Sequence, residues 1–253
     1  MPFVTNRSQR IHYTVTGSGP TVVFQHGLFQ CVDDWRDAGF VDGFADAYRV
    51  VCIDSLGHGQ SDKPTDPKAY GRSARAADVI AVLDAIGASR AHLIGYSMGG
   101  WIASGVAVES PERLASIVIG GWDLLDGAAA IAAKTTGVPS EQLSFDQVLA
   151  VGRTLELRLN EWFTPDAEQG LQACWNAVAE LEPGASAVAL LDCPALIWLG
   201  EDDAPHDSMS AWAAGHGLPF LSVPGDHMGA FVTHNKESIE GLRQFVDQVE
   251  QRD

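Results

Sequence analysis

The chain has 253 residues, of which 46% are hydrophobic, and its 33 acidic against 16 basic residues give a formal net charge of −17 at pH 7. This length suits one α/β domain that carries an insertion, and so large an apolar share excludes a disordered chain. We expect this acidic chain to bind neither nucleic acid nor anionic membranes, because both are bound mainly by basic side chains.

The N-terminal stretch MPFVTNRSQR has no apolar segment of the kind that a secretory signal needs. No apolar run approaches the roughly 20 residues that cross a bilayer. Four widely spaced cysteines form no C-x-x-C pair and are expected to be reduced and mostly buried: Cys31, Cys52, Cys174 and Cys193. We therefore expect a cytoplasmic protein.

Short apolar runs in the first half of the chain predict parallel strands. They are rich in Val and Ile, are bounded by Gly, Asp or Ser, and lie at residues 21–25, 48–54, 91–95 and 114–120. The preceding stretch RIHYTVTG alternates apolar and polar residues, which favours an antiparallel edge strand. Residues 74–87 follow a helical pattern that ends at a glycine. Strands that alternate with helices indicate a doubly wound α/β sheet.

This alternation stops at residues 122–192, where the sequence predicts only helices. A capping-box pattern at 144–147 precedes an apolar stripe that runs to residue 163. A further helix opens at the Thr-Pro pair 164–165 and closes at the Pro-Gly pair 183–184.

Strand patterns return at residues 194–200 and 218–225, and a last helix is predicted over 235–249. We therefore predict a core made of residues 1–121 and 193–253, with residues 122–192 inserted as a helical cap.

The stretch GYSMGG, residues 95–100, places Ser97 between a predicted strand and a predicted helix. Strand–turn–helix is the context that turns a Gly-x-Ser-x-Gly pattern from an ordinary glycine-rich bend into a candidate nucleophile site. On so tight a turn, side chains at Gly95 and Gly99 would clash with neighbouring backbone. The turn would present the Ser97 hydroxyl at the carboxyl end of the sheet, where open α/β sheets bind ligands.

A serine hydroxyl needs a base, and the best candidate among the eight histidines is His227, which directly follows the last predicted strand. His234 is a weaker rival at the start of the closing helix. His26 and His58 lie in tight glycine-rich turns, where a structural hydrogen-bonding role is expected. The other histidines lie in strand patterns, at the wrong end of the sheet or too near the candidate acids: His12, His92, His206 and His216.

An acid that orients the base should follow the preceding strand, where the sequence reads GEDDAPHD at residues 200–207. Asp202 and Asp203 are both candidates. A metal site made of these two aspartates with His206 and Asp207 is the rival interpretation, and it is disfavoured because nothing elsewhere supplies matched ligands. We therefore expect neither a metal nor a cofactor.

An oxyanion needs backbone donors, and two are available near the predicted serine turn. The stretch FQHGLF, residues 24–29, follows a strand and offers the N–H of Leu28, while Met98 offers its own N–H directly after the serine. Apolar side chains are candidates for a substrate pocket under the cap: Phe29, Trp35, Met98, Trp101, Trp122, Trp162, Trp175 and Met228.

Taken in order, these motifs resemble those of the α/β-hydrolase superfamily over almost the whole chain. The matching stretches are the oxyanion turn HGL (26–28), the loop DSLGHGQSD (54–62), the elbow GYSMGG (95–100), the acid turn GEDD (200–203) and the histidine loop GDHMG (225–229). The resemblance implies that Ser97 is the nucleophile and that Asp203, rather than Asp202, is the acid. It also implies a mostly parallel, doubly wound, eight-stranded sheet with the helical cap inserted after the sixth strand.

Departures from the family narrow the expected chemistry. Members that open epoxides or remove halide carry an aspartate at the elbow, so Ser97 argues against both activities. The oxyanion turn is not the His-Gly-Gly-Gly turn of many lipases and esterases, and the insert resembles no subfamily in detail.

The charge pattern bears on the substrate, because residues 159–235 contain no Lys or Arg although they include Asp203 and His227. We therefore predict hydrolysis of an apolar, uncharged ester or lactone through an acyl-enzyme on Ser97, with an alkaline optimum because the negative surroundings raise the pKa of His227. A thioester or C–C bond hydrolase with the same triad is one alternative. A ligand-binding sensor with little turnover is another. The sequence does not indicate whether the chain forms oligomers.

Overall fold

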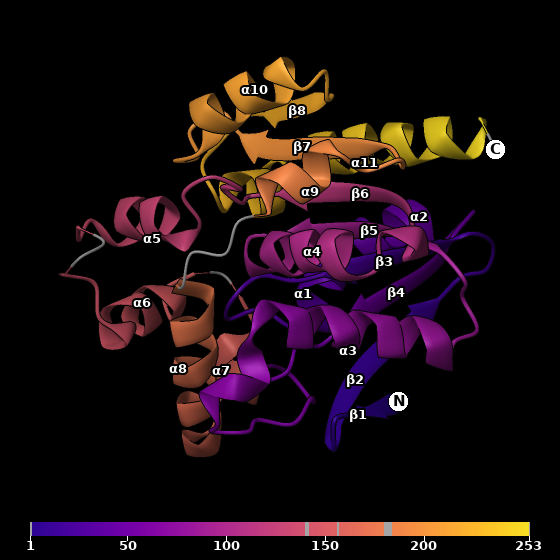
Figure 1. Cartoon of the computed structure of the whole chain (residues 1–253). Helices are drawn as coiled ribbons and strands as arrows, with labels where there is room; N and C mark the ends of the chain where they lie inside the picture. Colours follow the sequence, from indigo (N-terminus) through magenta and orange to yellow (C-terminus); the bar gives the residue numbers. More distant parts are fainter. Residues whose placement is uncertain (1, 140–141, 156, 180–183, 253) are drawn as a thin grey trace.

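The computed structural model describes residues 2–139, 142–155, 157–179 and 184–252, and it contains an eight-stranded sheet (Figure 1). The strands follow one another across the sheet in the order β1-β2-β4-β3-β5-β6-β7-β8. They are β1 (Phe3–Asn6), β2 (Gln9–Thr16), β3 (Thr21–Gln25), β4 (Arg49–Ile53), β5 (Ala91–Tyr96), β6 (Leu114–Gly120), β7 (Ala195–Gly200) and β8 (Phe220–Val223).

Parallel pairing dominates the sheet, as the sequence predicts. The pairs β1–β2 and β2–β4 are antiparallel, whereas every pair from β4–β3 to β7–β8 in the described ranges is parallel. The prediction of an antiparallel strand over RIHYTVTG is confirmed, but this strand is not the edge, because β1 lies outside it. The hairpin between them turns at Arg7 and Ser8, which have φ values of 48° and 65°. Such a turn usually carries Asn or Gly, so the sequence gives little signal for it.

Helices cover both faces of the sheet, which confirms the doubly wound arrangement. They are α1 (Val32–Asp37), α2 (Phe40–Phe44), α3 (Arg72–Ala85), α4 (Met98–Glu109), α10 (His206–Gly215) and α11 (Asn235–Glu250). In β3, Val22 and Phe24 pack in an apolar cluster with residues of α1, α2 and α11, while Val23 packs in a second cluster with residues of α3 and α4. Successive side chains of a strand point to opposite faces, so one buried strand serves both clusters.

Between β6 and β7 the chain forms helices, as predicted. They are α5 (Ala128–Thr136), α6 (Phe145–Gly152), α7 (Leu159–Trp162), α8 (Pro165–Ala179) and α9 (Ala185–Ala189). Figure 1 shows α5, α6, α7 and α8 grouped beyond one end of the strands. Helix α9 differs, because it packs against α4 and buries Val188 in the cluster on the sheet.

The helix signals within this segment are mostly accurate. The predicted capping box opens α6, where the Ser144 N–H donates to Gln147 Oε1 at 2.9 Å. The apolar stripe predicted to run to residue 163 is divided between α6 and the short helix α7. Helix α8 begins at Pro165 as predicted. Of its predicted end at 183–184, residue 183 lies outside the described residues and Gly184 directly precedes α9.

The four cysteines carry free thiols, and three of them are buried. Burial is the largest cause that raises the pKa of the Cys52 thiol, to about 12, so the reactive thiolate is suppressed there. Across the described part of the chain, every helix is too short or too polar to span a bilayer.

Candidate active site

Ser97 lies on the sharp turn that joins β5 to α4. Its backbone has φ 55° and ψ −121°, a strained conformation for a residue with a side chain, and its N–H donates to Gly120 O at 2.8 Å. A Cβ on Gly95 would lie 2.1 Å from Gly99 O, and a Cβ on Gly99 would lie 1.9 Å from Gln25 O. Both glycines are therefore required by the close approach of the helix to the strands.

His227 and Asp203 form a hydrogen-bonded pair, with His227 Nδ1 at 2.9 Å from Asp203 Oδ2. Asp203 is 5% exposed and lies in the turn after β7, where its Oδ1 accepts the Ala204 N–H at 2.8 Å. Asp202 is exposed, and it is its backbone that makes contacts: its N–H donates to Gly225 O at 2.9 Å and its carbonyl accepts from Lys134 Nζ. Of the two candidate acids, Asp203 is the one that contacts the histidine.

The surroundings of His227 favour its charged form. Burial of the imidazole acts to lower its pKa, but the charge and hydrogen bond of Asp203 and the charge of Asp226 outweigh burial. The pKa of His227 is consequently raised above the usual value of 6.5.

Ser97 and His227 line one cavity, together with the two expected oxyanion residues Leu28 and Met98. The cavity wall facing them comes from the segment between β6 and β7, and it includes Ile131, Val148, Val151, Leu157 and Val178. Among the described residues that line this cavity, none is Asp, Glu, Lys or Arg. The site therefore offers a ligand an apolar, uncharged surface beside the serine and the histidine.

Five of the expected pocket residues line this cavity: Phe29, Met98, Trp122, Trp175 and Met228. Three tryptophans do not. Trp35 is fully buried against Phe24 and Phe231 in the cluster with α2 and α11. Trp101 is buried in the cluster under α4, and Trp162 packs 5.5 Å from the His58 ring beside another cavity. Trp35 and Trp101 therefore stabilise the core, and Trp162 packs α7 against His58. None of the three contributes to the pocket beside Ser97.

The oxyanion turn is held by a residue that the sequence analysis missed. Gln30 is 2% exposed, and its side-chain Oε1 accepts the Gly27 N–H at 2.8 Å. The residue before it in the turn, Phe29, has a φ of 70°. Within the described ranges, the N–H groups of Leu28 and Met98 have no acceptor in the protein, so both remain available to a ligand. No local pattern marks Gln30, because its role depends on the fold of the turn.

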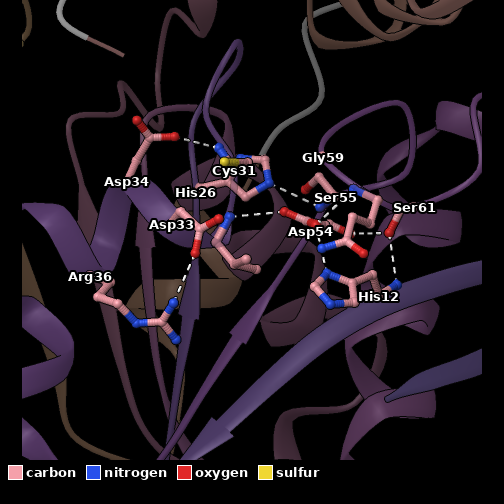
Figure 2. A network of polar contacts seen from close by, with 12 residues as sticks. His12, His26, Cys31, Asp33, Asp34, Arg36, Asp54, Ser55, Gly59 and Ser61 are labelled. Atoms are coloured by element: carbon pink, nitrogen blue, oxygen red, sulfur yellow. Dashed lines mark hydrogen bonds and ion pairs between the residues drawn. The ribbon is translucent and has the colours of Figure 1, made fainter. Parts of the chain in front are cut away.

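Behind this turn, Asp54 is the centre of a buried polar network (Figure 2). Its carboxylate accepts the Val32 N–H at 2.8 Å and the Gln60 N–H at 2.9 Å, and lies 2.7 Å from His12 Nδ1. His26 accepts the Ser55 N–H at 3.0 Å, and burial is the largest cause that lowers its pKa, to about 4. These contacts join the loop after β4 to the oxyanion turn, and His26 is structural as expected.

Other candidate side chains have partners away from the cavity. His206 lies 2.9 Å from both Asp207 Oδ1 and Ser222 Oγ. In the part of the chain that the structure describes, no group of three or more His, Cys, Asp or Glu residues is arranged to hold a metal ion.

A serine on a strand–turn–helix, above a mostly parallel sheet and with the acid and histidine after later strands, is the arrangement of α/β hydrolases. Residues 20–157, more than half of the chain, match the alpha/beta hydrolase fold family, and the chain belongs to this family.

Relatives within the family include several hydrolases. The chain is 38% identical over 153 residues to a 2-hydroxy-6-oxononadienedioate/2-hydroxy-6-oxononatrienedioate hydrolase of Burkholderia vietnamiensis, a match that covers 58% of this chain and 50% of that protein. The matches span about half or less of the length of the curated relatives.

Solved structures share the fold over nearly the whole chain. The enol-lactonase from Burkholderia xenovorans has a TM-score of 0.75 at 20% identity, covering 97% of this chain and all of that one. A thermophilic esterase from Thermogutta terrifontis has a TM-score of 0.76 at 21% identity, with 98% of each chain covered.

Proposed function

We propose that this protein is a serine hydrolase that cleaves an apolar, uncharged carboxylic ester or lactone through an acyl-enzyme on Ser97. The observation that supports this most directly is the cavity itself. It brings the serine and a histidine paired with Asp203 beside two free backbone N–H groups, within walls that carry no charge among the described lining residues. The proposed cap is residues 122–192, of which helices α5, α6 and α8 supply lining residues of the cavity.

In this mechanism His227 accepts the proton of the Ser97 hydroxyl as the serine oxygen attacks the substrate carbonyl. Asp203 stabilises the imidazolium that forms. The negative oxygen of the tetrahedral intermediate accepts hydrogen bonds from the N–H groups of Leu28 and Met98, each worth about 3 kcal/mol in such sites. Met98 is also the first residue of α4, whose N-terminal dipole favours negative charge.

The intermediate then collapses, and the imidazolium returns its proton to the leaving alkoxide as the carbonyl–oxygen bond breaks. Water next attacks the acyl-enzyme, His227 accepts a proton from it, and a second tetrahedral intermediate forms. When this collapses, the proton passes to Ser97 and the carboxylic acid is released.

A neutral substrate is favoured because none of the described lining residues is Lys or Arg, and His227, which can carry a positive charge, must be neutral to act as the base. The Burkholderia vietnamiensis relative is named for a substrate with two carboxylates. Cleavage of that kind of substrate is disfavoured here, since each buried carboxylate needs a basic residue or several N–H donors.

The test compares two p-nitrophenyl esters of equal acyl length, the butyrate and the hemisuccinate, which differ by a terminal carboxylate. We expect kcat/KM for the butyrate to exceed that for the hemisuccinate by about 100-fold or more, because the carboxylate enters an uncharged pocket. Preference for the hemisuccinate would contradict the substrate class. Butyryl-thioester and a neutral lactone, run beside them, distinguish the thioester alternative.

Labelling locates the nucleophile, and turnover separates an enzyme from a binding protein. A p-nitrophenyl alkylphosphonate should attach stoichiometrically to Ser97, as located by mass spectrometry of the digested protein, and should abolish turnover of the butyrate ester. A stoichiometric burst of p-nitrophenol from the butyrate without further turnover would instead support a sensor.

The pH profile tests the role of His227. Because the base must be neutral and its pKa is raised, the acid limb of kcat/KM should have its midpoint above pH 6.5, with activity falling tenfold per pH unit below it. Asp226→Asn removes one of the charges that raise this pKa, so its acid limb should move to lower pH. The asparagine side chain retains the Oδ1 that accepts the Gly229 N–H at 2.7 Å. The matched control is Asp207→Asn, an exposed charge beside His206, which should leave the limb in place.

Asp203→Asn should lower kcat by about 10⁴-fold with little change in folding, because the amide stabilises the wrong tautomer of His227. Asp202→Asn is the matched control, since it changes the neighbouring charge and leaves the backbone contacts of Asp202 intact. A larger loss of kcat in the Asp202 variant would reassign the acid.

A further inference from the structure

Tyr96 joins the serine turn to the histidine loop. It is the last residue of β5, is 1% exposed and is bonded directly to Ser97. Its hydroxyl donates to the backbone carbonyl of His227 at 2.5 Å. The Tyr96 side chain therefore links the serine turn to the main chain of His227.

The Tyr96 ring is fixed on several sides. Its centroid lies 4.5 Å from that of Trp198, 5.3 Å from that of Phe231 and 5.4 Å from that of the His227 imidazole. Gly121, with a φ of +55°, leaves the space that this packing needs. A Cβ there would lie 2.8 Å from Tyr96 Cζ and 3.0 Å from His227 Cε1.

The chain that follows the histidine loop is held separately. Ser238 Oγ donates to Ala230 O at 2.7 Å and accepts the Trp198 Nε1–H at 3.1 Å. The Tyr96 hydroxyl thus acts on His227 itself, whereas Ser238 anchors the chain three residues later.

We propose that Tyr96 is a positioning residue that sets the distance and orientation between Ser97 and His227, a role that rests on the proposed serine hydrolase mechanism. The imidazole must face the Ser97 hydroxyl with one nitrogen while the other bonds Asp203. A hydrogen bond at the His227 carbonyl fixes its main chain relative to the serine turn. Displacement of a reacting group by about 1 Å can cost 100-fold in rate, so this single contact has a large kinetic effect.

Tyr96→Phe is expected to lower kcat for the butyrate ester by about 10- to 100-fold with KM within about twofold. The acid limb of its pH profile should also move to lower pH. The phenylalanine ring keeps the imidazole buried, so the lowering of its pKa by burial persists. A loosened imidazole loses part of its contact with Asp203, whose charge and hydrogen bond, with the charge of Asp226, raise that pKa.

The matched control is Tyr48→Phe. Tyr48 is 4% exposed, and its hydroxyl also donates at 2.5 Å, to Asp247 Oδ1. It directly precedes β4, at the opposite end of the strands from Ser97. This variant also loses one tyrosine hydroxyl hydrogen bond, here to a carboxylate, so it should lose at least as much thermal stability while keeping kcat and the acid limb unchanged.

Unchanged kcat in Tyr96→Phe, an equal loss of kcat in Tyr48→Phe, or a lowered kcat with an unmoved acid limb would each overturn the proposal. Gly121→Ala is the second variant if Tyr96→Phe folds poorly, because its Cβ pushes Tyr96 and His227 apart and should give the same kinetic signature. Ser97→Ala is measured in parallel. If it keeps full activity, the serine mechanism fails, whereas an inactive Ser97→Ala beside an unaffected Tyr96→Phe rejects only the role of Tyr96.

Discussion

Replacing Ser97 by alanine is expected to lower kcat for a neutral ester by about 10⁵- to 10⁶-fold, close to the loss seen when a catalytic serine of this kind is removed. The residual rate should still exceed that in water, because the N–H groups of Leu28 and Met98 remain in place. The protein should stay folded, with the new alanine in the same strained turn. KM changes little, since the removed oxygen bonds to the substrate only after binding.

Steady-state hydrolysis of p-nitrophenyl butyrate measures this loss, and loss of phosphonate labelling confirms its site. Ser104→Ala is the matched control, because Ser104 lies on the same helix and its hydroxyl donates only to Trp101 O among the described hydrogen bonds. Its kcat should stay within about twofold of the parent, since it removes a hydrogen bond worth about 1 kcal/mol of stability and nothing from the cavity. A Ser97→Ala variant that retains most of the activity would exclude the acyl-enzyme.

Gly99→Ala is expected to lower the free energy of unfolding by about 3 kcal/mol or more, and to abolish activity in whatever fraction folds. Its Cβ would lie 1.9 Å from Gln25 O and 3.0 Å from His26 O, so the clash is with main chain rather than with a movable side chain. Relief requires α4 to move away from β3. This movement would displace Met98 and Ser97 together, because they open the same helix.

Urea unfolding followed by circular dichroism measures the loss of stability. Gly215→Ala is the control, because a Cβ on Gly215, in helix α10, meets nothing within 4 Å. Alanine there should be neutral or stabilising by up to about 1 kcal/mol, as expected for a glycine replaced within a helix. Equal stability of the Gly99→Ala and Gly215→Ala variants would show that the serine turn can relax without cost.

The strands and the serine turn were predictable because their signals are local. Buried parallel strands read as short apolar runs, and Gly95 and Gly99 flank Ser97 at the spacing that the turn imposes. The placement of Asp203 and His227 follows from topology, since parallel strands that end at one edge of a sheet bring the residues after them together. Choosing Asp203 over Asp202 needed the family resemblance, because both carboxylates occupy the same turn.

The remaining features depend on contacts that sequence patterns do not encode. The β1 hairpin turns through Arg7 and Ser8, which carry no turn signal. Apolar periodicity does not tell which neighbour a ring contacts, so Trp35 was indistinguishable from the tryptophans that line the cavity. The contacts of Gln30 and Tyr96 join side chains to the main chain, and the hydrogen bond of Tyr96 crosses 131 residues of sequence.

The cavity has walls of two origins. Ser97, Leu28 and Met98 are held by main-chain geometry after the ends of β5 and β3, where Gly95 and Gly99 leave no room for a side chain. The facing wall comes from helices α5, α6 and α8, most of whose cavity-lining side chains are small or medium apolar residues. Substitutions in this wall can therefore accumulate one residue at a time without moving the proposed reacting groups Ser97 and His227. New substrates should arise in this protein through the segment between β6 and β7, with the bond-breaking chemistry inherited unchanged.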